Sequence, residues 1–195
     1  MPSAVKQTGE NLLQCTVKLT GADLVLFNLA DVGAPIRPQG FGTQFGPNQS
    51  VEAIYVSDHS MPPFATLPAW VYGVTPSDAT KYKEGVEAYG LVFVCAETKS
   101  PPPMRMPGGG FMTLAVETPR DKALRLLAHE LAHVRQAWML NTNFAAEYER
   151  SLPYERSIYE KIAFQVAEKF MKQERAHIKN GAFDRFLPNW VISTK

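Results

Sequence analysis

The sequence predicts an α+β protein with a β-rich front half and a helical back half. Before Thr118, short runs rich in β-branched and aromatic residues alternate with turn residues, a pattern typical of strands. After Thr118, apolar residues recur at spacings of three and four, which is typical of amphipathic helices. We therefore expect a single domain over residues 1–195, with a β-rich lobe over 1–117 and a helical lobe over 118–195.

The front half is expected to hold a series of short strands. A turn at 19–22 is expected to join the first two as a hairpin. Segments 33–49 and 101–110 are rich in Gly and Pro and are expected to be loops, and one short helix is expected within 77–90. The expected strands are LLQCTVKL, ADLVLFNLA, SVEAIYVSD, AWVYGV, GLVFVCAET and GFMTLAVET.

The back half begins with a clear helix start. Thr118 can cap a helix and Pro119 suits its first position. From there the pattern predicts a helix to about Met139, and a second helix is expected over about 155–179. The apolar face of the first helix is Leu124, Leu127, Leu131 and Val134.

Composition excludes several classes of protein. The chain has 195 residues, 45% of them hydrophobic and 20% charged, with a net charge of +1. These values are typical of a soluble globular protein, and no basic run indicates nucleic acid. The apolar runs are too short to span a bilayer. The start lacks a signal-peptide pattern, so the cytoplasm is the default compartment, and secretion remains open if a leader has been removed. Cys15 and Cys95 are expected to be buried thiols.

The motif that carries chemistry is HELAH, at residues 129–133. On a helix His129 and His133 lie one turn apart on the same side, at a separation that one zinc ion can bridge. Glu130 is rotated by about 100° and can instead reach a water beside the metal. This is the H-E-x-x-H arrangement of two ligands and a general base, and both histidines lie off the leucine stripe.

A catalytic zinc site needs a third protein ligand. The extended H-E-x-x-H-x-x-G-x-x-H pattern is excluded because Gln136 and Met139 occupy the positions that require glycine and histidine. The third ligand is therefore expected later in the chain. The candidates, in order of preference with the last unranked, are Glu155, Glu160, Glu149 and Glu168.

The stretch HELAHVRQ, followed by PYERSIYE, resembles the glutamate-liganded zinc metallopeptidases known as gluzincins, and more narrowly their small soluble bacterial relatives. The resemblance covers roughly residues 118–170 and implies a minimal zincin-like fold. It also implies that a glutamate near the start of the second helix completes the site, which favours Glu155. Tyr159 then stands where related peptidases have aspartate, and the N-E-x-x-S-D pattern of the thermolysin-like branch is absent.

These observations predict a zinc metallopeptidase that acts on peptides or proteins. Zn²⁺ would be held by His129, His133 and Glu155, with Glu130 as general base. The oxyanion donor is expected among Tyr148, Tyr154, Tyr159 and His177, and Tyr159 is the preferred candidate. The strand GGFMTLAV is expected to pair with an extended substrate peptide as an added strand. The alternatives are a non-catalytic metal-binding module, and a toxin-type or effector hydrolase on the same site.

Overall fold

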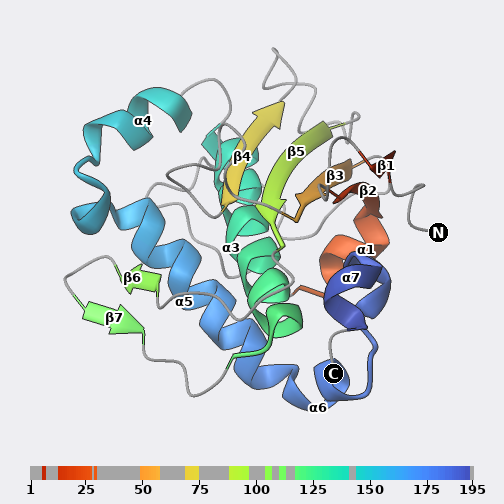
Figure 1. The fold of residues 1–195 in the computed structure, drawn as a ribbon. Coiled ribbons are helices and arrows are strands. Elements are labelled where there is room, and N and C mark those ends of the chain that lie inside the picture. Colours follow the sequence, from red (N-terminus) through yellow and green to blue (C-terminus); the bar gives the residue numbers. More distant parts are fainter. Residues whose placement is uncertain are drawn as a thin grey trace.

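The computed structural model contains a mixed five-stranded sheet with the long helix α3 (Pro119–Leu140) packed against one of its faces (Figure 1). The predicted α+β class is confirmed. The prediction of a single domain over 1–195 stays a prediction, because part of the chain is not described. The structure describes residues 6–7, 13–27, 29, 49–57, 69–74, 88–96, 104–106, 110–112, 117–140 and 144–193.

The five-stranded sheet has the order β1-β2-β3-β5-β4. Its pairs are antiparallel except β3 and β5, which run parallel. The strands predicted at 12–19, 50–58, 69–74 and 90–98 are confirmed apart from their ends. The bounds are β1 (Lys6–Gln7), β2 (Leu13–Thr20), β3 (Gln49–Val56), β4 (Ala69–Val74) and β5 (Ala88–Cys95).

The hairpin predicted at 19–22 is wrong, because the chain turns there into helix α1 (Gly21–Val25). Thr20 caps this helix: its hydroxyl accepts from the Asp23 backbone N–H at 3.4 Å, and the Asp23 carboxylate accepts from the Thr20 N–H at 2.9 Å. This reciprocal capping box satisfies two backbone donors at the helix start. That local stabilisation outweighs the strand preference of the run ADLVLFNLA.

The last predicted strand, at 110–118, is confirmed only in part. β6 (Met104–Met106) and β7 (Gly110–Met112) form a separate two-stranded antiparallel sheet, so β7 does not join the five-stranded sheet. β6 also lies within a segment expected to be a loop. Of the loop expected at 33–49 and the short helix expected within 77–90, residues 33–48 and 77–87 lie outside the described residues, as do 113–116. Gln49 and residues 88–90 instead lie in β3 and β5.

The core lies between the sheet and α3. The predicted apolar face of α3 is buried, with no more than 1% exposure at any of its four positions. Gly90 of β5 allows the helix to come close, because a Cβ there would lie 2.8 Å from Val134 Cγ1. The sheet side of this core is Cys15, Val17, Leu19, Val51, Ala53, Tyr55, Val92 and Val94.

The two cysteines are free and buried, as expected. Cys15 pairs across the ladder with Tyr55, and Cys95 pairs with Val56. Directly opposed residues share a face of a sheet, whereas successive residues such as Tyr55 and Val56 point to opposite faces. Cys15 and Cys95 therefore lie on opposite faces of the sheet and do not form a disulfide.

The helical half is divided more finely than predicted. The single helix expected at 155–179 is a 3-10 turn, η3 (Tyr154–Arg156), then α5 (Ile158–Gln173) and α6 (Arg175–Lys179). α5 starts at Ile158 because the Ser157 side chain caps it, accepting from the Glu160 N–H. Helix α4 (Phe144–Arg150) precedes this segment.

After α6, the chain returns to the N-terminal part through η4 (Asp184–Phe186) and α7 (Asn189–Ile192) (Figure 1). Arg185 of η4 pairs with Asp23 of α1 at 3.0 Å. The ring of Phe27, after α1, stacks on Phe170 at 5.0 Å and contacts Phe186 at 5.5 Å. The Tyr55 hydroxyl donates to the Phe186 carbonyl at 2.7 Å. No helix in the described part of the chain combines the length and apolar composition needed to cross a membrane.

α5 packs along α3 in the antiparallel direction. One turn back along α3 corresponds to one turn forward along α5, as expected for helices that meet through positions four apart. We call this line of contacts the α3–α5 seam. Its contacts are His133 with Glu160, His129 with Phe164, and Arg125 with Glu168.

Candidate metal centre

Helix α3 brings the two predicted histidine ligands together inside the protein. His129 and His133 are 6% and 4% exposed, and their Nε2 atoms lie 3.1 Å apart. Glu130 is 5% exposed, and its Oε1 lies 4.0 Å from His129 Nε2. The two imidazoles come from consecutive turns and meet edge to face, with ring centroids 4.7 Å apart and the Glu130 carboxylate beside them.

A carboxylate from α5 completes this group. Glu160 Oε2 lies 3.2 Å from His129 Nε2, and Glu160 Oε1 lies 3.3 Å from His133 Nε2. Glu160 is 3% exposed and lies in the first turn of α5. Among the residues that the structure describes, His129, His133 and Glu160 are the group of side chains that could hold a metal ion. We call these three residues the His-His-Glu cluster.

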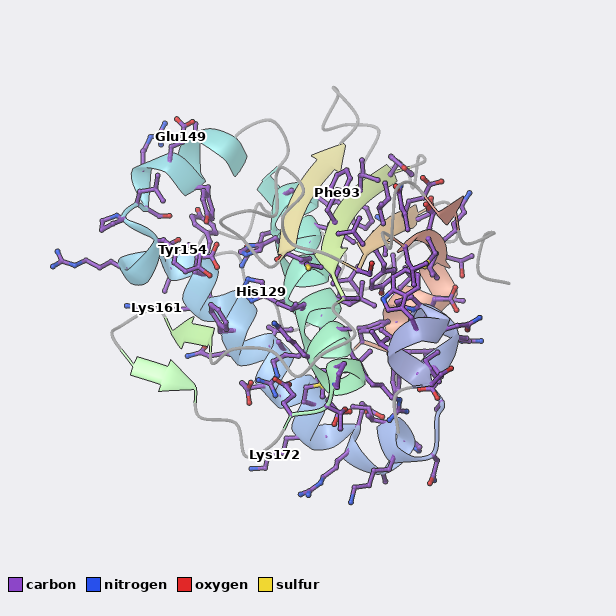
Figure 2. All side chains as sticks on the ribbon, in the orientation of Figure 1. Phe93, His129, Glu149, Tyr154, Lys161 and Lys172 are labelled. Carbon is purple, nitrogen blue, oxygen red and sulfur yellow. The ribbon has the colours of Figure 1, made fainter. Side chains whose placement is uncertain are left out.

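The prediction of Glu155 as a ligand falls on a side chain outside the described part of the structure. Its backbone lies in η3, before α5 begins, rather than at the start of the second helix as expected. Glu160, the second choice from the sequence, is the glutamate that the structure places against both histidines. Glu149 lies on α4, exposed and away from His129 (Figure 2), and Glu168 pairs with Arg125.

The cluster could hold a metal ion, and the spacing of its donor atoms can be compared with that around a tetrahedral zinc ion. Bonds of about 2.0 to 2.2 Å at tetrahedral angles would place ligand atoms about 3.3 to 3.6 Å apart. The two Nε2 atoms lie 3.1 Å apart, and the two oxygens of Glu160 lie 3.2 Å from His129 Nε2 and 3.3 Å from His133 Nε2, one oxygen on each ring. Two imidazoles and one carboxylate are donors that suit zinc, whereas magnesium and calcium prefer oxygen alone.

Burial and mutual charge shift the pKa values of these groups apart. Burial lowers the pKa of His129 to about 4 and raises that of Glu130 to about 7. For His133, hydrogen bonding to Glu160 and the charges of Glu160 and Glu130 outweigh burial and raise the pKa to about 9. Hydrogen bonds and charge from both histidines, against burial, hold the pKa of Glu160 well below its usual range. Without metal, a proton on His133 thus stabilises the ionised Glu160.

Two tyrosines surround the Glu160 carboxylate. The Tyr148 hydroxyl, from α4, donates to Glu160 Oε1 at 2.5 Å, and its ring lies 6.1 Å from that of His133. Burial and the charge of Glu160 raise the pKa values of both Tyr148 and Tyr154 far above the usual range. Both phenols therefore keep their protons at neutral pH and act as donors. In Figure 2, Tyr154 is at the end of α5 that carries Glu160.

The other two predicted oxyanion donors lie differently. Tyr159 is buried, and its backbone carbonyl accepts a hydrogen bond from Gln136 at 3.1 Å. Burial and the charge of Glu147, rather than the charges of the cluster, raise the pKa of the Tyr159 hydroxyl. A catalytic role of Tyr159 stays a prediction. His177 is on α6, where its Nδ1 lies 2.7 Å from Glu174 and its side chain is 70% exposed.

A buried ion cluster lies one turn before His129 on α3. Arg125 is 7% exposed and contacts Glu117 Oε1 at 2.5 Å and Glu168 Oε1 at 3.3 Å. Burial raises the pKa of Glu117, and the charge of Arg125 offsets this only in part. Through Arg125, this ion cluster links Glu117, just before α3, to Glu168 on α5. It therefore connects the start of α3 to the α3–α5 seam.

The sequence pattern does not reveal the roles of two residues at the site. Gln136 is fully buried and contacts His133, and Phe164 packs against the His129 ring at 4.4 Å between centroids. The pattern also favours Glu155 over Glu160 as the third ligand, because it predicts that the helix opens near Glu155. The available signal was Ser157, whose capping position puts Glu160 in the first turn.

No family model, curated protein or solved structure matches the chain. The function is therefore inferred from the geometry of the site and from the sequence motif.

Proposed function

We propose that the protein is a zinc-dependent metallopeptidase that hydrolyses peptide bonds in peptides or proteins. The observation that carries this proposal is the pairing of the His-His-Glu cluster with Glu130. A site that only holds a metal needs no further carboxylate, whereas hydrolysis needs a general base next to the metal. The gluzincin resemblance of the sequence supports the same reading, now with Glu160 as the third ligand.

His129, His133 and Glu160 would hold the ion and leave a fourth position open. Zinc, when bound, supplies Lewis acidity and lowers the pKa of a water to about 7. Glu130 takes a proton from the attacking water and later gives it to the nitrogen of the leaving amine. Glu130 is not one of the three residues that could hold the ion, and its Oε1 lies 4.0 Å from His129 Nε2, so its carboxylate would be available as a base beside the ion.

The oxyanion that forms on the attacked carbonyl needs a hydrogen-bond donor. Tyr148 and Tyr154 lie beside Glu160 with protonated hydroxyls, which favours them over Tyr159 and His177. The non-catalytic module and the effector-type hydrolase remain the alternatives. The carboxylate of Glu130, buried beside the metal ligands, favours an enzyme over the module.

The first test is the zinc content of the purified protein and of matched glutamate variants. We expect one zinc per chain in the wild type, loss of zinc in Glu160→Ala, and retention in Glu155→Ala. Zinc loss in Glu155→Ala alone would restore the ligand predicted from the sequence. A wild type that binds no zinc after loading and removal of excess would overturn the proposal.

The second test separates the enzyme from the module. Glu130→Gln is expected to retain zinc and to lose cleavage of a mixed library of fluorescence-quenched peptides. The matched control is Gln165→Met, an exposed substitution on α5, which is expected to retain both properties. Equal cleavage by Glu130→Gln and the wild type would refute the role of Glu130. No cleavage by zinc-loaded wild type would favour the module.

A further inference from the structure

Gln136 links the two helices that carry the candidate ligands. It is fully buried on α3, one turn beyond His133. Its Oε1 lies 2.8 Å from His133 Nδ1, and its Nε2 donates to the backbone carbonyl of Tyr159 at 3.1 Å. Tyr159 is the residue before Glu160, so one amide side chain contacts a ligand on α3 and the backbone next to a ligand on α5.

These two hydrogen bonds determine how the Gln136 amide is oriented and which nitrogen of His133 donates to it. A backbone carbonyl can only accept, so the NH₂ group of Gln136 must face Tyr159. The amide oxygen then faces His133, which requires the proton of that ring to be on Nδ1. With Nδ1 protonated, the lone pair of a neutral ring is on Nε2, the atom that faces His129 and Glu160.

In the described part of the structure, no side chain accepts a hydrogen bond from Nδ1 of the His129 ring as Gln136 does from Nδ1 of the His133 ring. The His129 Nδ1 atom is buried and has no hydrogen-bond partner there. The ring is instead held by packing against Phe164, at 4.4 Å between centroids and 58° between planes. Packing can hold a ring in place, but it does not select which nitrogen carries the proton.

We propose that Gln136 is a positioning residue that selects the metal-binding tautomer of His133 and holds it in register with Glu160. This inference rests on the proposed metal site. Side chains that orient histidine ligands in this way typically contribute 10- to 100-fold to metal affinity. Gln136→Met has a similar length and removes both hydrogen bonds, whereas Gln136→Glu retains an acceptor for the ring proton.

The first measurement is zinc affinity, by competition with a chromophoric chelator. We expect Gln136→Met to bind zinc about 10- to 100-fold more weakly than the wild type. Gln136→Glu is expected to recover part of that loss, and the control Gln165→Met is expected to match the wild type. Circular dichroism checks that each variant is folded. Equal affinity of folded Gln136→Met and wild type would overturn the inference.

The second measurement uses NMR and does not depend on metal. In the metal-free wild type, the His133 ring should show a downfield Nδ1–H resonance protected from exchange, and folded Gln136→Met should lose it. In the zinc-loaded wild type, long-range ¹H–¹⁵N correlations should assign the proton to Nδ1. A proton on Nε2 in the zinc-loaded form, or an unprotected Nδ1–H without metal, would overturn the inference even if Gln136→Met does not fold. A wild type that shows the protected Nδ1–H but binds no zinc would instead refute the proposed function alone.

Discussion

Tyr148 donates its hydroxyl hydrogen bond to Glu160, the carboxylate that stands against both histidines. The contact joins α4 to α5 directly at the candidate ligand. A hydrogen bond from a phenol to a carboxylate is charge-assisted and stronger than one between neutral groups. Tyr148 therefore holds Glu160 in place and fixes α4 over the cluster.

Removal of this hydroxyl should loosen the ligand without unfolding the protein. We expect Tyr148→Phe to weaken zinc binding by about tenfold, because Glu160 keeps its place on α5 but loses a donor. Chelator competition measures the affinity, and Tyr159→Phe is the matched control because Tyr159 accepts the Gln136 hydrogen bond through its backbone carbonyl, which the substitution retains. Unchanged affinity in Tyr148→Phe would show that the hydrogen bond does not orient the ligand.

Gly90 is the point where α3 approaches β5 most tightly, since an added Cβ would meet Val134 at 2.8 Å and Val51 at 3.2 Å. We expect Gly90→Ala to lower the free energy of unfolding by about 1–3 kcal/mol through overpacking. Urea denaturation measures this loss. In combination with Val134→Ala, which opens space beside the new methyl group, the total loss should be smaller than the sum of the two single losses. Additive losses would contradict the steric explanation.

Arg125 is the cation between the carboxylates of Glu117 and Glu168, one turn before His129 on α3. Arg125→Met retains most of the apolar stem but leaves Glu117 and Glu168 without their partner. We expect a loss of about 3 kcal/mol in the free energy of unfolding, at the low end for buried pairs because Glu168 is 44% exposed. Arg175→Met, exposed on α6, serves as the control and should change stability by less than about 0.5 kcal/mol.

Glu117 predicts a pH dependence of a definite sign. Its pKa is raised in the folded protein, so the folded state holds the proton more tightly than the unfolded state. The stabilisation is therefore complete below the ordinary pKa of the carboxyl group and is lost as pH rises through the raised value. Glu117→Gln should flatten the fall in unfolding free energy across this window, measured by urea titrations at several pH values. An unchanged pH slope would show that Glu117 is not the titrating group.

Zinc should stabilise the folded protein, because the three ligands come together only in the fold. Free zinc at one hundred times its dissociation constant would add about 2.7 kcal/mol to the free energy of unfolding. Thermal unfolding with and without zinc measures this effect, and a chelator should reverse it. The His133→Ala variant should show no comparable shift. A shift of equal size in that variant would indicate binding elsewhere.

Local signals predicted α3 well. Thr118 accepts from the Asp121 N–H at 3.1 Å, Pro119 opens the helix, and the apolar stripe is buried as expected. All of these features depend on residues within a few positions of each other. The prediction of a hairpin at 19–22 was wrong although its correction was also a local signal. Thr20 and Asp23 form the helix start, whereas the β-favouring residues of the following run indicate a strand.

The third ligand could not be predicted in the same way. All the glutamates in this region are near His133 in sequence, and the choice among them depends on where α5 begins and how it lies on α3. The start at Ser157 is a local feature, whereas the packing is set by contacts between distant residues. The roles of Gln136 and Phe164 were missed for the same reason, since both depend on the approach of α5.

Because the candidate ligands lie on both sides of the α3–α5 seam, the metal site depends on how the two helices are aligned. If α5 slid by one turn along α3, Phe164 would replace Glu160 opposite His133 and Glu168 would come opposite His129, so His133 would face a ring instead of a carboxylate. The alignment of α5 on α3, as much as the glutamate itself, therefore determines whether a carboxylate lies opposite His133. A bound ion would in turn oppose sliding of the two helices, because its ligands would come from both of them.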